Sequence, residues 1–258
     1  MTPARFYLPS LVTSMALLCA FGGLIAANDH RYAFASAAVL LAIVFDGLDG
    51  RVARMMRTET AFGGQYDSLC DMCAFGIVPA LIAYDGALRD LGCWGFAIGF
   101  LFLACASLRL ARFNVNAGVV DKRWFQGLPS PAAAAAVVSY IWWSAEAPDA
   151  ALAGSPLLCA AAVAVSGIAM VSKVPYPSGK RLPMILWLAL IALAAASVAA
   201  LARFVGARAA LPGMLCGLVW IYVAAGLVFH RVMTVRQVVL DNYAARSSAR
   251  LFTRDMKR

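Results

Sequence analysis

Long apolar segments separated by short polar ones occupy most of the 258-residue chain. A helix that crosses a membrane needs about 20 predominantly apolar residues, and the sequence offers eight candidate segments, of which the fifth is the shortest. They are Leu8–Ala27, Ala33–Met55, Gly64–Tyr84, Cys93–Asn114, Pro131–Ser144, Leu152–Val171, Pro183–Phe204 and Leu211–Met233. The pattern predicts an all-α fold, a polytopic integral membrane helix bundle with about eight transmembrane helices.

The composition and the distribution of charge agree with a membrane location. Hydrophobic residues make up 63% of the chain, charged residues make up 14%, and the mean hydropathy is +0.78, which is too apolar for a soluble globular protein. With the amino terminus placed in the cytoplasm, all but four of the 22 lysine and arginine residues fall on cytoplasmic segments. The four exceptions are Arg31, Arg89, Arg203 and Arg208. We therefore expect a multi-pass protein of the cell (inner) membrane with both termini in the cytoplasm. The net charge of +9 then reflects insertion and contact with anionic membrane lipids, and predicts no nucleic-acid partner.

Four aspartates interrupt the apolar pattern near the cytoplasmic ends of the second and third predicted spans. Asp46 and Asp49 lie three positions apart, and Asp67 and Asp71 lie four apart, so each pair shares one face of its helix. Because one aspartate at the centre of a membrane helix costs about 2.5–3.5 kcal/mol, four of them require a neutralising cation. The two faces carry Asp46, Asp49, Gly50 and Ala53 in the second span, and Gly63, Asp67 and Asp71 in the third.

The chemistry of this donor set indicates which cation it would hold. Carboxylate oxygens suit Mg²⁺ or Mn²⁺ better than Zn²⁺, and four carboxylates could hold two divalent ions, which bridge phosphate groups well. Arg54, one turn nearer the cytoplasm, would add a charge-assisted contact to a phosphate. Gly50, Ala53 and Gly63 leave room for a substrate to approach the backbone. These residues predict metal-dependent diphosphate chemistry at the cytoplasmic face.

Two other interpretations of the aspartates remain open at this point. The carboxylates could form a buried ion-pair network with Arg51, Arg54 and Arg57. They could also line the cation or proton pathway of a transporter, because ionisable residues inside a membrane often mark such pathways.

The run from Asp46 to Asp71 resembles the signature of the CDP-alcohol phosphotransferase family at every fixed position. That signature is D-x2-D-G-x2-A-R-x8-G-x3-D-x3-D, and the fixed positions here are Asp46, Asp49, Gly50, Ala53, Arg54, Gly63, Asp67 and Asp71. The resemblance implies that all four aspartates line a site for two divalent ions that bridge the CDP diphosphate. It also implies that Asp71 is the general base that deprotonates an acceptor alcohol, and that Gly50, Ala53, Arg54 and Gly63 face the nucleotide and its diphosphate.

Three further stretches are similar to the branch of this family that uses serine, the membrane-embedded CDP-diacylglycerol–serine O-phosphatidyltransferases. They are Arg109–Asn114, Phe125–Pro131 and Ser172–Ser178. The resemblance makes Arg109, Arg112, Asn114 and Lys173 candidates for binding the acceptor or the lipid phosphate. Arg109 and Arg112 could instead only anchor the topology. One departure is Ser10, which stands where the branch often has asparagine.

The resemblance implies a transferase of phospholipid biosynthesis that moves a phosphatidyl group from CDP-diacylglycerol to L-serine and releases CMP. Residues 1–182 would form a core of six transmembrane helices, residues 183–233 two additional helices, and residues 234–258 a basic cytoplasmic tail. We expect a homodimer. The alternatives are the same chemistry with choline, inositol or glycerol phosphate as acceptor and, outside the family, a cation-coupled transporter.

Overall fold

The computed structural model describes residues 4–56, 60–115, 124–147, 154–172, 174–177 and 209–226. Its helices, in chain order, are α1 (Ala4–Asn28), α2 (Tyr32–Met56), α3 (Ala61–Asp71), α4 (Val78–Gly86), α5 (Cys93–Val115), α6 (Ser130–Glu146), α7 (Pro156–Val171) and a last helix over Ala209–Gly226. A short 3₁₀ turn, Leu88–Leu91, connects α4 to α5. The prediction of an all-α fold is confirmed.

Five helical segments in the described residues are long and apolar enough to cross a membrane. They are Pro9–Asn28, Tyr32–Gly50, Ala61–Gly86, Cys93–Val115 and Ala209–Gly226. The predicted fifth and sixth spans are the shorter helices α6 and α7. The predicted seventh span, Pro183–Phe204, lies outside the described residues, as does the end of the eighth beyond Gly226. The chain is therefore a multi-pass membrane protein, and the described residues do not establish a count of eight.

The third span is one continuous rod built from three pieces. After Asp71 the backbone passes through a π-helical stretch, Met72–Ile77, before it returns to the α conformation in α4. A π stretch inside a helix is rare and is frequently found at functional sites. Here it begins at the residue that follows the last aspartate of the motif.

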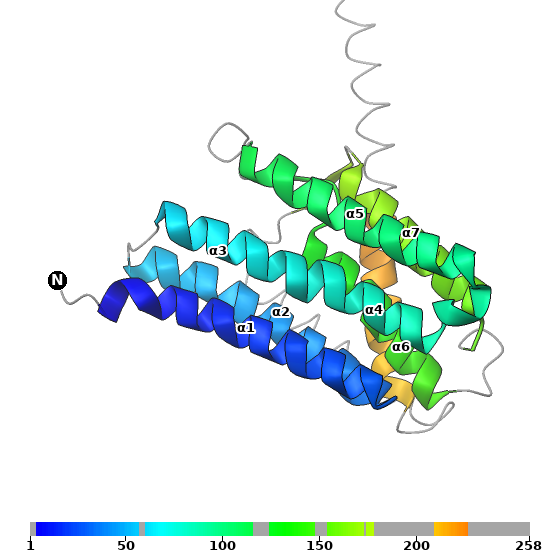
Figure 1. Cartoon of the computed structure of the whole chain (residues 1–258). Coiled ribbons are helices and arrows are strands. Elements are labelled where there is room, and N and C mark those ends of the chain that lie inside the picture. The colour runs from blue at the N-terminus through cyan, green and yellow to red at the C-terminus, as the bar shows by residue number, and fades with distance from the viewer. Residues whose placement is uncertain are drawn as a thin grey trace, which may run out of the picture.

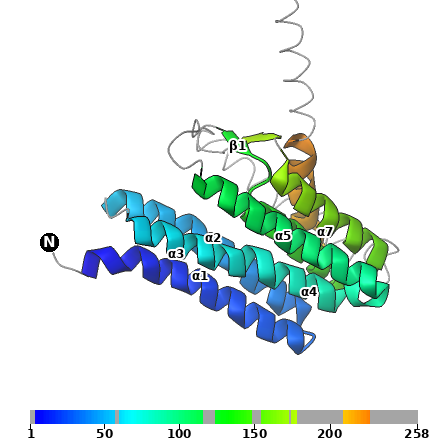
Figure 2. The ribbon, with the colours of Figure 1, turned by 45° about the horizontal axis from the view of Figure 1, so that its top comes forward.

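The bundle is arranged around α6, whose residues 133–141 are all buried. Helices α1 and α2 lie side by side as a hairpin, the α3–α4 rod runs along them, and α5 and α7 pack together on the far side of the rod (Figure 1). A second view shows the Ala209–Gly226 helix beside α7 (Figure 2). The run Ala132–Ala136 lets neighbouring backbones approach α6 closely, as small residues do in membrane bundles.

A small antiparallel sheet joins two loops for which the sequence predicted no regular structure. Strand β1 (Trp124–Gln126) pairs with β2 (Pro175–Pro177), with Phe125 opposite Tyr176. Gly127 follows β1 with a φ of 82°, and its N–H donates to the Val174 carbonyl at 2.8 Å. Only glycine adopts such a backbone readily. Tyr176 is fully buried, and its hydroxyl donates to the Val223 carbonyl, so the sheet also anchors the Ala209–Gly226 helix.

Candidate metal centre

Helices α2 and α3 bring three of the four predicted aspartates together. Asp46 and Asp49 lie on α2, and Asp67 lies on α3. One carboxylate oxygen from each lies within 4.8 Å of the other two. The helical spacing produces this convergence, because each helix keeps its acidic positions on one face and the two faces meet. Three oxygens at this separation can coordinate one cation together.

Asp71, the last residue of α3, lies beside this cluster. Its carboxyl group is within side-chain hydrogen-bonding reach of Asp46 and is not one of the three clustered groups. Asp71 therefore lies next to Asp46 at the edge of the cluster. A carboxylate at this edge could serve as a further ligand or handle a proton next to the cluster.

The burial of the carboxylates and the partners of their oxygens fit a bound cation. Asp49 is only 6% exposed, and the buried Oδ1 of Asp67 has no hydrogen-bond partner among the described residues. Buried polar atoms are nearly always paired, so a carboxylate oxygen in an acidic cluster with no partner among the described residues favours a donor or a cation beyond them. Oxygen donors alone suit Mg²⁺ or Mn²⁺. The ion-pair alternative is not tested, because the side chains of Arg51, Arg54 and Arg57 lie outside the described part.

Helix α1 contributes two hydroxyl groups that the sequence analysis missed. Thr13 Oγ1 donates to Asp49 Oδ2 at 2.7 Å, and Ser14 Oγ and the Tyr66 hydroxyl lie 2.8 Å apart. The signals in the sequence were a pair of adjacent hydroxyl residues inside an apolar span and the match of Leu11-Val12-Thr13 to the Leu-x-Thr that the family often has near its start, and neither assigned Thr13 a role. Their partners lie on α2 and α3, and a single sequence does not reveal such long-range pairs.

The predicted nucleotide-binding positions lie at the ends of α2 and α3 that flank the cluster. Gly50 follows Asp49 directly, and a Cβ atom added to it would meet no other atom within 4 Å. Gly63 lies in the first turn of α3, where its N–H donates to Thr60 Oγ1 at 3.0 Å and so caps the helix. Ala53 and Arg54 lie on the last turns of α2, and their side chains are not described. Gly50 thus borders open space beside the carboxylates.

Arg109 is a predicted acceptor residue that interacts with two of the aspartates. It is buried on α5, 8% exposed, and interacts electrostatically with Asp71 and Asp46. Its Nη1 donates to Ser130 Oγ at 2.8 Å, and its Nε has no hydrogen-bond partner in the described residues. A buried guanidinium with an unused donor next to an acidic cluster can bind an anionic group of a substrate.

The other predicted acceptor residues occupy different places. The Arg112 guanidinium donates to the carbonyls of Met170, Val171 and Ser172, which are left open where α7 ends. Asn114 Oδ1 accepts a hydrogen bond from Ser68 Oγ at 3.1 Å and thereby links α5 to α3 next to Asp67. Lys173 lies outside the described residues. These contacts give Arg112 and Asn114 a structural role, and their binding roles stay predictions.

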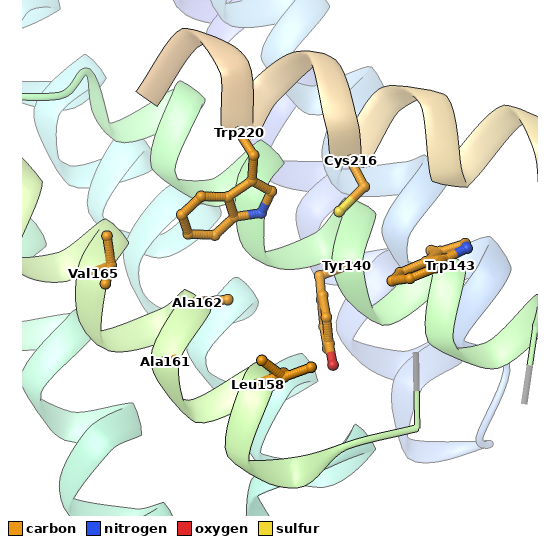
Figure 3. A pocket seen from close by; sticks show the side chains of 8 residues that line it. All are labelled: Tyr140, Trp143, Leu158, Ala161, Ala162, Val165, Cys216 and Trp220. Atoms are coloured by element: carbon orange, nitrogen blue, oxygen red, sulfur yellow. The ribbon is translucent and has the colours of Figure 1, made fainter. Parts of the chain in front are cut away.

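A separate cavity of about 370 Å³ lies among α6, α7 and the Ala209–Gly226 helix (Figure 3). Its wall consists of aromatic side chains, Tyr140, Trp143 and Trp220, together with small and aliphatic residues such as Leu158 and Val165. None of the described residues that line it carries a carboxylate or a basic group. This lining does not suit a cation or a diphosphate, and the aspartate cluster remains the candidate site for chemistry.

Comparisons with known proteins agree with this location. The family model for CDP-alcohol phosphatidyltransferase matches residues 6–174, a range that contains all four aspartates, Arg109 and Arg112. The chain is 31% identical to CDP-diacylglycerol–serine O-phosphatidyltransferase of Helicobacter pylori over 88% of this chain and 96% of that protein.

Two archaeal proteins are similar over a smaller part of the chain. A CDP-diacylglycerol–serine O-phosphatidyltransferase of Methanocaldococcus jannaschii is 34% identical over 54% of this chain and 61% of that protein. The archaetidylserine synthase of Methanothermobacter thermautotrophicus is 33% identical over 66% of this chain and 69% of that protein. The family model matches most of the chain, and the matched range contains the four aspartates. The protein therefore belongs to the CDP-alcohol phosphatidyltransferase family.

Proposed function

We propose that the protein transfers a phosphatidyl group from CDP-diacylglycerol to L-serine, giving phosphatidylserine and CMP. The observation that carries this proposal is the convergence of Asp46, Asp49 and Asp67 within the part of the chain that matches the family. The relatives support serine as the acceptor. Some are named for diacylglycerol and one for an archaetidyl lipid, yet all of these names contain serine.

The four aspartates would hold two divalent ions, Mg²⁺ or Mn²⁺, with Asp46, Asp49 and Asp67 as the clustered ligands and Asp71 beside them. When bound, such ions supply positive charge that offsets the charge of a diphosphate during transfer. Gly50, Ala53 and Gly63 leave space for the nucleotide, and Arg54 makes a charge-assisted contact with its phosphates. The unpaired Asp67 Oδ1 supports this assignment.

The serine hydroxyl is the nucleophile of the proposed reaction. Its oxygen forms a bond to the phosphorus on the lipid side, the bond from that phosphorus to the CMP oxygen breaks, and Asp71 takes the hydroxyl proton. Arg109 holds the serine carboxylate through its free Nε, and Ser130 fixes the guanidinium. Arg112, Asn114 and Lys173 complete the acceptor and lipid-phosphate side.

A direct assay tests the function. Purified protein in detergent receives CDP-diacylglycerol, Mn²⁺ or Mg²⁺, and one alcohol from a panel of serine, choline, inositol and glycerol phosphate, with CMP release as the readout. Release with serine alone supports the proposal, whereas release with another alcohol alone shows that the acceptor is wrong. A cation-coupled transporter would release no CMP under any of these conditions.

The proposal includes a place in the cell and an assembly. The active site faces the cytoplasm of the cell (inner) membrane, both termini are cytoplasmic, and the protein is a homodimer. The positive-inside distribution supports the orientation. Labelling of Arg258→Cys by a membrane-impermeant thiol reagent in sealed vesicles, with the wild type and its seven native cysteines as the control, tests the orientation. The mass of the protein in detergent, with the detergent subtracted, tests the homodimer.

A further inference from the structure

We infer that Thr13 on α1 is a positioning residue that orients Asp49 for cation binding. This inference rests on the proposed function only in that it requires a cation at the aspartate cluster. It adds a residue outside the Asp46–Asp71 motif, from a helix that carries no ligand. Helix α1 would then be part of the metal centre, because it fixes one of the carboxylates.

The contact between Thr13 and Asp49 is short and enclosed. Thr13 Oγ1 lies 2.7 Å from Asp49 Oδ2, and both residues are 6% exposed. Thr13 Oγ1 also lies 3.1 Å from the Pro9 carbonyl. A hydroxyl has one proton to donate, and a charged acceptor at the shorter distance makes the stronger bond. The proton of Thr13 therefore points at Asp49.

The geometry of Thr13 makes it a rigid donor. Threonine is β-branched, and inside a helix its hydroxyl commonly settles over the carbonyl four residues earlier, here that of Pro9. The side-chain rotamer that places Oγ1 near this carbonyl also places it at the carboxylate, so the branching limits the orientations of the donor while its one proton goes to Asp49. With Oδ2 fixed by Thr13, the plane of the Asp49 carboxylate is set relative to Asp46 and Asp67.

A second contact braces α1 against the other helix that supplies ligands. Ser14, next to Thr13, lies within 2.8 Å of the Tyr66 hydroxyl, and Tyr66 precedes Asp67 on α3. Adjacent hydroxyl residues on α1 thus contact α2 at one ligand and α3 beside another. The distance between the two ligand-bearing helices depends in part on α1.

The hydrogen bond from Thr13 does not replace a cation. A neutral hydroxyl satisfies one lone pair of Asp49 and cancels none of the charge that the three carboxylates share. Hydrogen bonds that orient metal ligands typically change metal affinity or activity by about 10- to 100-fold when they are removed. Thr13 therefore affects how tightly the cation binds more than whether the helices fold.

The test compares Thr13→Val, which keeps the shape and loses the donor, with Thr13→Ser, which keeps the donor. Ser36→Ala is the matched control, because Ser36 is buried on α2 and its hydroxyl has no hydrogen-bond partner among the described residues. Each protein is placed in nanodiscs, and Mn²⁺ binding is measured from the loss of the free Mn²⁺ EPR signal. Thermal unfolding in EDTA gives the stability without metal.

We expect Thr13→Val to raise the Kd for Mn²⁺ by about 10-fold or more, with Thr13→Ser within about twofold of the wild type and Ser36→Ala unchanged. A Kd unchanged in Thr13→Val, whether or not its unfolding temperature in EDTA falls, would show a structural role only and overturn the inference. So would Thr13→Ser binding as weakly as Thr13→Val.

Failure of this inference can be distinguished from failure of the proposed function. A wild type that binds Mn²⁺ but releases no CMP from CDP-diacylglycerol contradicts the proposed function and leaves the role of Thr13 to be judged by the binding data. A wild type that binds no Mn²⁺ overturns the role of Thr13, because there would be no cation for Asp49 to meet.

Discussion

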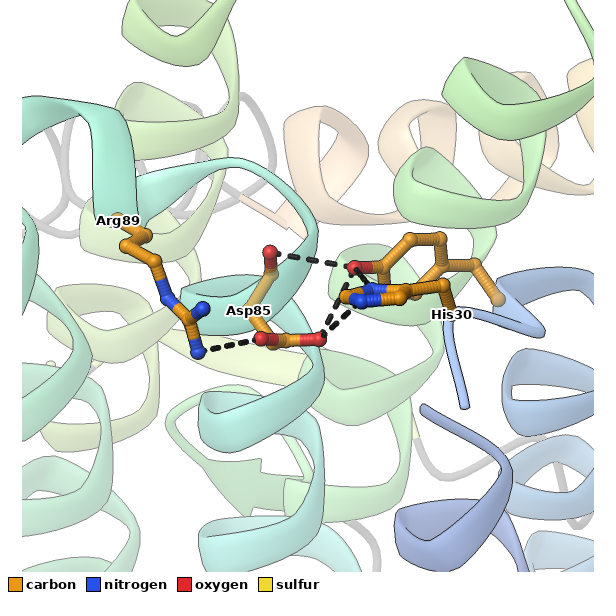
Figure 4. Close-up of polar contacts among 4 residues, drawn as sticks. His30, Asp85 and Arg89 are labelled. Atoms are coloured by element: carbon orange, nitrogen blue, oxygen red, sulfur yellow. Dashed lines mark hydrogen bonds and ion pairs between the residues drawn. The ribbon is translucent and has the colours of Figure 1, made fainter. Parts of the chain in front are cut away.

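Carboxylates lie in two regions of the bundle, separated by roughly 25 Å along α2, and they differ in their partners. At one end, Asp85 meets Arg89 Nη2 at 2.6 Å through Oδ1 and accepts from the Tyr32 hydroxyl at 2.9 Å through Oδ2, with His30 Nδ1 3.6 Å away (Figure 4). At the other end, Asp67 Oδ1 lies among acidic neighbours without any partner in the described residues.

This difference distinguishes a structural carboxylate from one that awaits a ligand. The Asp85 group ties the turn between α1 and α2 to the end of α4, and both of its oxygens are satisfied by the protein itself. The carboxylates of Asp46, Asp49 and Asp67 repel one another, and the described contacts of Thr13 and Arg109 leave Asp67 Oδ1 without a partner, so a bound cation should stabilise this cluster further. Substitutions in the cluster should therefore abolish activity with little change in stability. Substitutions in the Asp85 group should lower stability and leave activity intact.

The largest effect is expected from the clustered aspartates. Asp46→Asn or Asp67→Asn should reduce CMP release to background, because the loss of one charged ligand removes several kcal/mol of charge stabilisation. Protein yield and unfolding temperature in EDTA should stay close to the wild type, since the change relieves repulsion. EDTA should inactivate the wild type, and added Mn²⁺ or Mg²⁺ should restore it. Normal turnover in either mutant, with EDTA harmless, would contradict the metal centre.

Asp71→Asn should have the next largest effect, a loss of turnover on the order of 10²–10⁴-fold, the usual worth of general-base catalysis. Asp71 lies beside the cluster, so CDP-diacylglycerol binding should persist in this mutant, whereas Asp46→Asn should weaken it. Binding and turnover are measured on both mutants. Near-normal turnover of Asp71→Asn would mean that another group takes the proton.

How much of the site the sequence predicts depends on how far apart the partners lie along the chain. The spacing within α2 and α3 predicts the faces that carry the aspartates, because a helix fixes the relation between residues three or four positions apart. The contacts of Thr13 with Asp49 and of Arg112 with the end of α7 join residues 36 and about 59 positions apart. Nothing local specifies such pairs, so the sequence could not reveal them.

The sequence also could not reveal the pairing between the loops that contain β1 and β2, because these partners lie far apart along the chain. The prolines at 175 and 177 correctly excluded a helix, but proline has no N–H to donate to a ladder, so strand β2 was not predicted beside β1. Arg112 shows the consequence for the site. The resemblance made Arg109 and Arg112 candidates for binding the acceptor or the lipid phosphate, and the structure adds that Arg112 donates to three carbonyls at the end of α7, so its binding role stays a prediction.

A smaller effect is expected from the two arginines of α5, and it should distinguish them. Arg109→Gln should raise the KM for serine by about 10- to 100-fold, because a hydrogen bond to a charged group is worth about 1.5–3 kcal/mol, with little change in Mn²⁺ affinity. Arg112→Ala should instead lower the unfolding temperature, because it leaves the α7 carbonyls without a donor. A serine KM that rises only in Arg112→Ala would assign the acceptor role to Arg112.

The smallest effect is expected where the carboxylate is already paired. The Arg89 side chain is 63% exposed, so its ion pair with Asp85 is worth about 0.2–1 kcal/mol, and Arg89→Ala should lower stability by no more than that. CMP release should remain at the wild-type rate, because the pair lies at the far end of α2 from the aspartates. Denaturant unfolding and the CMP assay on the same preparation measure both quantities.

Tyr32→Phe, which removes the other donor to Asp85, serves as the companion variant and should also leave turnover intact. A large loss of turnover in either variant would show that the paired end is coupled to the metal centre, and that pairing alone does not separate structural carboxylates from functional ones in this bundle.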